Sequence, residues 1–237
     1  MQFLVGTSGF SYKEWKGHFY PKELPDKEML SHYAQQFSAV EINSTFRRFP
    51  AATTVDAWAQ QGSDSFRFAL KARQSITHFR RLRNAEEQID DFIDITSLLG
   101  KRRGPLLFQL PPNFKKDIPR LDAFFNYVAG RAAIVFQLQH ESWFNDDVFR
   151  CLRAHSAALA SVDDEGPACN KVVGTADWGY VRLRHERYTD ASLKKWVKRI
   201  KAQDWKEVYV FFKHEDVGAG PKLASRFAEL AECTKAP

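Results

Sequence analysis

Eight short apolar runs recur along this 237-residue chain, and their spacing constrains the fold more than any other feature. They lie at residues 3–5, 40–42, 66–70, 106–110, 134–138, 158–162, 180–183 and 208–212. The intervals between them are too long for hairpins and suit βα units, so the runs predict parallel strands.

Most of these intervals carry apolar residues at helical spacing, as Ile89, Phe92 and Ile93 do. The predicted helices lie at residues 27–37, 53–60, 85–99, 121–128, 146–155, 191–202 and 221–232. The exception is segment 164–179, where Gly166, Pro167 and two further glycines favour a loop. We therefore expect the sixth helix to be missing or vestigial.

Eight strands with mostly helical crossovers predict an α/β fold, a TIM (β/α)8-type barrel in a single domain spanning residues 1–237. An open doubly wound sheet is the alternative. The glycine fingerprint of a dinucleotide-binding fold is absent, because Gly6-Thr7-Ser8-Gly9 is too short for it.

Composition places the chain among ordinary globular proteins and leaves an anionic partner possible. The formal net charge is +6 and the isoelectric point is near 9.2. Three cysteines (Cys151, Cys169 and Cys233) follow no disulfide or zinc spacing, so we expect reduced thiols in a cytoplasmic protein. Neither a signal peptide nor a membrane-spanning segment is visible, so no membrane partner is expected.

Polar side chains gather on the predicted inner side of the strands, because successive strand residues point to opposite faces. When the apolar residues face the helices, the inward residues are Glu41, Asn43, Arg67, Ala69, Lys71, Gln109, Gln137, Gln139, Ser161, Asp163, Arg182, Arg184, Tyr209, Phe211 and Lys213. Most of the polar ones come late in their strands, which is the end where barrel enzymes build their sites.

This pattern predicts a basic pocket with two carboxylates. Glu41 and Asp163 are the candidate catalytic acid and base. The candidate anion-binding residues are Lys71, Arg182, Arg184 and Lys213. Residues expected to orient a substrate are Asn43, Gln109, Gln137 and Gln139, with His78 and Trp143 added from the loops. The alternative is a set of ion pairs that only stabilises the interior.

No sequence motif specifies a metal or cofactor. A metal site could be assembled from Glu41, His78, Asp163 and His214, but no local spacing supports it, so we assign no metal and leave the cofactor unknown. Trp15, Trp143 and Trp178 are expected in loops at the pocket end, where indoles stack on a base or a sugar or else pack as a lid.

Several blocks of residues resemble the domain-of-unknown-function-72 family (DUF72, YecE-like). The most specific are residues 6–12 (GTSGFSY), 40–46 (VEINSTF) and 107–114 (LFQLPPNF), and the resemblance covers nearly the whole chain. The resemblance implies a TIM barrel without an established reaction. Its outline is similar to the sugar isomerase and endonuclease IV superfamily, which by analogy implies anionic or nucleotide-like substrates.

The chain departs from the family pattern at three positions near the predicted pocket. Gln137 and Gln139 stand where the family usually has Glu and Arg. Arg184-His185 replaces a usual His-Gly, and Lys213-His214 replaces a usual Asn-Asn or Asn-Asp. The first change removes one possible acid or base, and Lys213 keeps the pocket positive.

Three functions are consistent with these features. The first is an enzyme, or a degenerate relative of one, that acts on a phosphate- or carboxylate-bearing small molecule or a nucleic-acid end. The second is a non-catalytic nucleic-acid-binding barrel. The third is a purely structural or partner-docking barrel, in which Glu41 and the basic residues only pair internally. The oligomeric state is not specified by the sequence.

Overall fold

The computed structural model describes residues 1–164, 171–185, 187–213 and 218–231 of the chain. Its strands are β1 (Gln2–Thr7), β2 (Ala39–Ile42), β3 (Arg67–Lys71), β4 (Arg103–Gln109), β5 (Ile134–Gln137), β6 (Ala158–Leu159), β7 (Ser161–Val162), β8 (Trp178–Leu183) and β9 (Glu207–Phe212). All eight predicted runs are strands. The sixth run is divided at Ala160 into β6 and β7.

Seven α-helices occur in the described part of the chain. They are α1 (Met29–Ala34), α2 (Ala52–Ala59), α3 (Glu86–Ser97), α4 (Ile118–Val128), α5 (Asp146–Ala154), α6 (Asp190–Lys201) and α7 (Ala219–Leu230). Each matches a predicted helix. Residues 171–177, just before β8, contain no helix, as expected for the missing sixth one, whereas residues 165–170 lie outside the described residues.

Local sequence explains where several helices begin. Asp117 accepts a hydrogen bond from the Arg120 backbone N–H at the start of α4, and Asn145 does the same for two N–H groups of α5. Thr189 caps α6 through the Ser192 N–H. No helix among the described residues is both long enough and apolar enough to cross a membrane.

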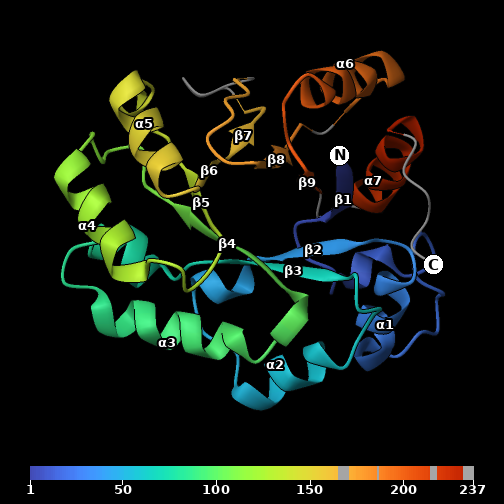
Figure 1. The fold of residues 1–237 in the computed structure, drawn as a ribbon. Helices are drawn as coiled ribbons and strands as arrows, with labels where there is room; N and C mark the ends of the chain where they lie inside the picture. The colour runs from blue at the N-terminus through green and yellow to red at the C-terminus, as the bar shows by residue number, and fades with distance from the viewer. Residues whose placement is uncertain (165–170, 186, 214–217, 232–237) are drawn as a thin grey trace.

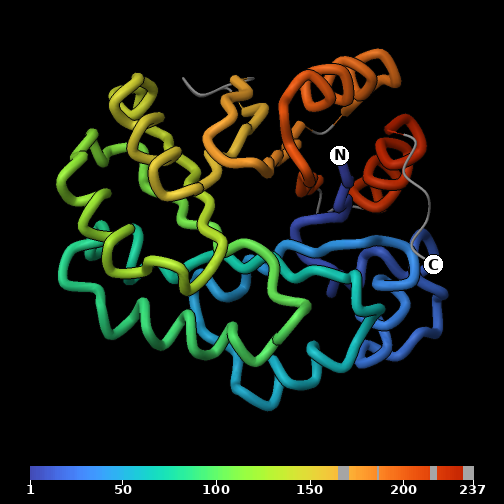
Figure 2. Tube along the Cα trace, in the orientation of Figure 1, coloured from blue at the N-terminus to red at the C-terminus, as the bar shows by residue number. Residues whose placement is uncertain are grey.

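The helices lie around the outside of the molecule and the strands at its centre (Figure 1). Figure 2 shows the chain passing once around the molecule, from blue through green to red, so that α7 lies beside β1. All strand pairs are parallel, which confirms the predicted parallel α/β fold.

The strands form two sheets, with orders β1-β9-β8-β7 and β2-β3-β4-β5-β6. Among the described residues no continuous ladder joins them, so the predicted closed barrel is not confirmed. At one junction only Ala160 separates β6 from β7. At the other, one isolated bridge pairs Ser8 with Glu41.

The hydroxyl of Tyr33, on α1, explains why β1 and β2 do not form a ladder. It accepts a hydrogen bond from the Thr7 N–H at 2.7 Å and donates to the Ala39 carbonyl at 3.1 Å. The Val5 N–H likewise donates to the Ser38 hydroxyl at 3.0 Å. Side-chain oxygens therefore occupy the positions that backbone partners would take.

The apolar core has two layers, one on each face of the strands. An outer layer contains Phe68, Leu70, Phe108 and Phe136 and packs against the helices. A smaller inner layer takes residues from both sheets, and its members are Leu4, Ala39, Ala69, Leu107, Val135, Ala158, Ala160, Val162, Tyr180, Tyr209 and Phe211. The predicted alternation therefore holds in most strands.

The sixth run is an exception to the predicted facing. Val162 packs in the inner layer, whereas Ser161 was expected to point inward. The run ALASV has small residues on both faces, so its hydrophobicity could not indicate which face is buried in the interior. The Ser161 hydroxyl is buried and has no hydrogen-bond partner within the described residues.

The Tyr33 hydroxyl should contribute measurably to stability. We expect Tyr33→Phe to lower the free energy of unfolding by about 1–3 kcal/mol, because it leaves a buried N–H and a buried carbonyl unsatisfied. Chemical denaturation measures this. The control is Tyr127→Phe, which removes an exposed hydroxyl bonded to Asp90 and should change stability little. Equal effects of the two variants would contradict the assignment.

Candidate functional site

A fully buried carboxylate, Glu41, lies at the carboxyl end of β2 and accepts four hydrogen bonds. The donors are Ser8 Oγ at 2.6 Å, Asn43 Nδ2 at 3.0 Å, Tyr180 Oη at 2.7 Å and Arg182 Nη2 at 2.8 Å. Both carboxylate oxygens are engaged. The group is thus a buried ion pair with three further donors.

Arg182 extends from β8 across the interior to the other sheet. Its Nη1 donates to the Gln137 side-chain oxygen on β5 at 2.5 Å, while Nη2 pairs with Glu41 on β2. Its Nε is buried and has no acceptor among the described residues. The arginine therefore links β8 with both β2 and β5 at the carboxyl ends of these strands.

The environment of Glu41 favours its ionised form. Burial raises its pKa, but the Arg182 charge and the hydrogen bonds from Ser8, Tyr180 and Arg182 together outweigh burial and lower the pKa to about 2. A carboxylate with this pKa is a poor proton acceptor at neutral pH. The hydrogen bonds around Glu41 fit the positioning of Arg182, and the role of Glu41 as catalytic acid or base stays a prediction.

Lys71 ends β3 and lies near the same network. Its ammonium is 4.1 Å from the centre of the Phe46 ring, a cation–π contact. Among the described residues no carboxylate lies within ion-pair distance of it. Burial, and then the charges of Arg182, Arg184 and Lys213, lower the pKa of Lys71 to about 8, although Glu41 partly opposes them.

Asp163 directly follows β7 and is almost completely buried. It accepts hydrogen bonds from the Arg184 backbone N–H at 2.6 Å and from the Tyr188 hydroxyl, and His185 Nε2 is 4.0 Å away. Burial raises the pKa of Asp163 above its usual range, although these neighbours act in the opposite direction. Its proton affinity is thus shifted towards neutral pH.

A cavity of about 250 Å³ opens at this end of the strands. The described residues that line it are Asp163, Asp164, Arg184, His185 and Lys213. The Arg184 guanidinium has no carboxylate within ion-pair distance in the described part of the chain, and burial followed by the charge of Arg182 lowers its pKa. The cavity thus offers charged groups of both signs within reach of one small ligand.

The remaining predicted polar residues lie around this network. Asn43 donates to Glu41, but its Oδ1 is buried without a partner among the described residues. Gln109 ends β4 and Gln139 lies two residues after β5; both are half-buried, and no described residue bonds their amides. His78 Nδ1 shares a hydrogen bond with Thr77 Oγ1 at 2.9 Å, and the His78 ring packs edge-on against Phe46.

The predicted stacking role of the tryptophans is not supported by their positions. Trp143 is buried and donates from Nε1 to the Phe114 carbonyl at 2.6 Å, so it holds the loop after β4. Trp15 is fully buried, and Trp178 begins β8 at the opposite end of the strands. Burial of the large apolar indole rings under the loops stabilises the fold, and it leaves these rings inaccessible to a ligand.

Four residues of the site were not predicted. Ser8 was missed because the first strand was not analysed for which residues face the interior. Alternation from Leu4 and Gly6 would have placed Ser8 on the inward side. Tyr180 follows from the same alternation as Arg182 and looked like an ordinary apolar residue. Tyr188 and Asp164 come from irregular segments, where alternation gives no signal.

A second, open groove of about 680 Å³ lies after β4 and beside the start of α4. Its lining includes Arg81, Asn113, Lys115, Lys116 and Arg120. The Arg81 guanidinium donates to the Asn113 side chain at 3.2 Å. Arg81 has φ 49°, in the left-handed region that is uncommon for residues other than glycine.

Among the described residues, Glu41, His78 and Asp163 do not converge into a cluster of metal ligands. His214, the fourth member considered from the sequence, lies outside the described residues.

The fold and the site together define a class of protein. Its members are parallel α/β chains with a buried carboxylate–guanidinium pair at the carboxyl ends of the strands. The sequence model described as "Protein of unknown function DUF72" matches residues 4–237, so the chain belongs to the DUF72 family.

Relatives and solved structures agree with this membership. The UPF0759 protein YecE of Escherichia coli K12 is 31% identical over 116 residues, a match that covers 48% of this chain and only 43% of YecE. The UPF0759 protein YunF of Bacillus subtilis is 24% identical, with 96% of this chain and 94% of YunF covered.

Two crystal structures of DUF72 family proteins have the same fold. The protein from Thermotoga maritima superimposes with a TM-score of 0.84 at 25% identity, and the match covers 98% of this chain and 100% of that one. The protein from Enterococcus faecalis gives 0.81 at 16% identity, with 100% and 98% covered.

Removing the charge of Glu41 should destabilise the protein strongly. We expect Glu41→Gln to lower the free energy of unfolding by about 3–5 kcal/mol at pH 7, because Arg182 is left as a buried charge without its partner. Chemical denaturation at pH 7 measures this. The control is Asp64→Asn, which breaks the exposed pair with Arg102 and should have little effect.

The same pair predicts a pH dependence. The pKa of Glu41 is about 2 when folded against an ordinary value of 4.5, so its contribution is complete above pH 4.5 and is lost as the pH falls towards 2. The difference in stability between wild type and Glu41→Gln should therefore shrink over this range. A difference that stays constant from pH 6 to pH 2 would contradict the assigned pair.

Proposed function

We infer that the two sheets are two parts of one (β/α)8 barrel. The strand formed by β6, Ala160 and β7 pairs with β5 at its start and with β8 at its end. The Ala160 N–H donates to the Phe136 carbonyl, and the Asp163 N–H donates to the Arg182 carbonyl. At the other junction the Gly9 N–H donates to the Glu41 carbonyl at 2.7 Å, and the inner apolar layer contains residues of both sheets.

We propose that this protein is an enzyme that binds a phosphate- or carboxylate-bearing small molecule at the carboxyl ends of its strands. The observation that carries the proposal is the state of Lys71 and Arg184. Both are partly buried beside other cations, and neither has a carboxylate partner in the described part of the chain. Such an arrangement costs free energy in the absence of a ligand, and an anion offsets that cost.

The residues divide into three roles in this proposal. Lys71, Arg184 and Lys213 bind the anionic group, with the guanidinium able to form two parallel hydrogen bonds. Asp163 lines the same cavity, and burial raises its pKa above the usual carboxyl range, so it is the candidate general acid or base in this proposal. Glu41 holds Arg182 in place, which keeps a further positive charge beneath the site.

The amides of the site would select the ligand. Asn43 Oδ1, Gln109 and Gln139 have hydrogen-bonding capacity that the described residues leave unused. Hydroxyl groups on a substrate, such as those of a sugar phosphate, match this set because they both donate and accept. The proposed ligand is therefore a polyhydroxylated or nucleotide-like anion.

A second candidate is binding of an extended polyanion such as single-stranded nucleic acid. The open basic groove that contains Arg81, Lys115 and Arg120 favours it. The burial of Trp15 and Trp143 counts against it, because bases usually stack on accessible aromatic rings.

Lys71→Met tests the proposal because a ligand-binding role and a structural role of Lys71 predict opposite changes in the free energy of unfolding. In the ligand-free protein the charged lysine costs stability fully below pH 8, and the cost disappears as the pH rises towards 10.5. Lys71→Met should therefore raise the free energy of unfolding at pH 7 by about 1–3 kcal/mol. A loss of stability would mean that Lys71 serves the fold and would overturn the proposed role.

The same variant should lose ligand binding. Thermal shifts are measured with inorganic phosphate, sugar phosphates, nucleotides, small carboxylates and a short single-stranded oligonucleotide. A ligand at about a hundred times its dissociation constant should add roughly 2.7 kcal/mol to wild type. Lys71→Met should lose this gain, whereas the control Lys101→Met, exposed at the opposite strand end, should keep it.

Each other outcome is also informative. A flat response of wild type to every compound would overturn the proposal of an anion site. A shift given only by the oligonucleotide, lost in Arg120→Gln and kept in Lys71→Met, would favour the polyanion candidate instead.

A further inference from the structure

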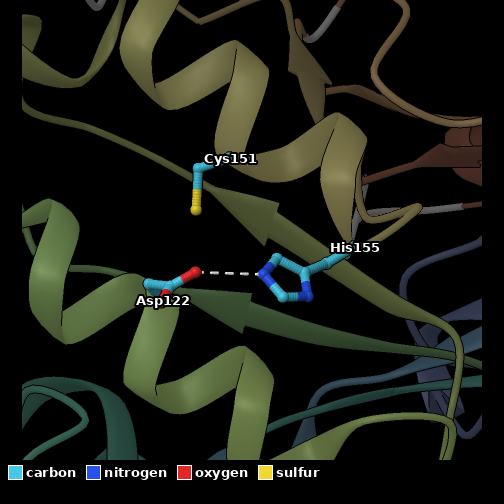
Figure 3. Close-up of side chains that lie close together, drawn as sticks. All are labelled: Asp122, Cys151 and His155. Carbon is cyan, nitrogen blue, oxygen red and sulfur yellow. Dashed lines mark hydrogen bonds and ion pairs between the residues drawn. The ribbon is translucent and has the colours of Figure 1, made fainter.

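A cluster of three metal-binding residue types lies on the outer surface, between two neighbouring helices. Asp122 comes from α4, Cys151 from α5, and His155 directly follows the last residue of α5 (Figure 3). One ligand atom from each residue can be chosen so that all three lie within 4.8 Å of one another. Residues four apart on a helix share a face, so Cys151 and His155 both project towards α4.

Neighbouring side chains hold two of these groups in position. Asp122 Oδ1 is 3.1 Å from His155 Nε2, and the other carboxylate oxygen of Asp122 accepts from Asn126 Nδ2 at 3.1 Å. The His155 ring stacks on Phe125, with centroids 4.6 Å apart and planes inclined by 12°. Support of this kind around ligands is typical of metal sites.

The distances and donor types suit zinc. Zinc–nitrogen and zinc–oxygen bonds of about 2.0–2.2 Å in tetrahedral geometry place the two ligand atoms about 3.4 Å apart, close to the observed 3.1 Å. A thiolate and an imidazole together favour zinc over magnesium or calcium, which prefer oxygen ligands. Asp122 is exposed and the cluster opens to solvent, so an ion can reach it without a change in the core.

We propose that Asp122, Cys151 and His155 bind a zinc ion, with water as the fourth ligand. The ion joins α4 to α5 on the outside of the fold, separate from the pocket at the strand ends. Three protein ligands leave one coordination position open, which is typical of reactive or exchangeable sites and unlike closed structural sites.

Binding requires the Cys151 thiol to lose its proton, which passes to the buffer as the zinc–sulfur bond forms. Burial, and then the Asp122 charge, raise the pKa of the free thiol, so the metal-free protein carries a neutral sulfhydryl. Cys151 is half-buried and forms no disulfide.

The test uses the full-length protein with cobalt as a spectroscopic substitute for zinc. Wild type should bind one cobalt ion with a near-ultraviolet thiolate-to-metal absorption band and the visible bands of tetrahedral cobalt, and zinc should displace it. Cys151→Ser should lose the thiolate band. Cys169 and Cys233 are retained in every variant, so the loss is assigned to Cys151.

The other ligands are tested by competition with a chromophoric chelator. Asp122→Asn and His155→Gln should each weaken zinc binding by at least about 10- to 100-fold. This is the loss in affinity that removal of a residue hydrogen-bonded to a ligand typically causes, and removal of a ligand itself should cost no less. The control is Asp146→Asn, which removes an exposed carboxylate from the first turn of α5 and should leave the affinity unchanged.

Asp122→Asn should fold like wild type, because this exposed residue lies outside the apolar core. A loss of zinc binding in this variant therefore cannot be ascribed to misfolding. A thiolate band that persists in Cys151→Ser would overturn the proposal, as would equal zinc affinities of wild type, Asp122→Asn and His155→Gln. The result does not depend on the anion pocket, because Lys71→Met should bind zinc as wild type does.

Discussion

The pairing of Glu41 with Arg182 is the interaction on which the rest of the pocket depends. Both groups are removed from water, and neither charge is sustainable there without the other. Ser8 and Tyr180 satisfy further lone pairs of the carboxylate, and Gln137 occupies a second donor of the guanidinium. Because Arg182 comes from one sheet and Glu41 from the other, their pairing also fixes how the strand ends meet.

The pair also determines the electrostatics of the cavity above it. Glu41 offsets the charge of Arg182 and leaves Lys71 and Arg184 to repel each other. In the proposed function, these two cations without carboxylate partners among the described residues are what favours an anion-binding site over a network of ion pairs that only stabilises the interior.

The sequence predicts the strands and helices well, and it indicates several of the polar residues that meet at the strand ends, for a physical reason. Strands buried between helices and an interior carry apolar residues on one face, so alternation alone indicated that Glu41, Gln137 and Arg182 point inward. Alternation fails where both faces carry small residues, as at Ser161 and Val162. It also says nothing about which strands exchange hydrogen bonds, so barrel closure could not be derived from it.

Side chains that act across long distances in the sequence were beyond prediction. The contacts of Tyr33 with Thr7 and of Tyr188 with Asp163 depend on the packing of irregular segments, which follows from the assembled fold. Trp143 likewise looked accessible because loops are usually at the surface. The Asp122, Cys151 and His155 cluster needed two helices to meet, and only the spacing within α5 was visible in the sequence.

Tyr33 has a consequence for how the molecule opens. In an ordinary sheet, the amide of Thr7 would be protected from solvent hydrogen exchange by the neighbouring strand. Here its acceptor belongs to α1, so departure of that short helix exposes the amide even while both sheets stay intact. Local unfolding of the first helix and exposure of the boundary between the sheets are therefore one cooperative event.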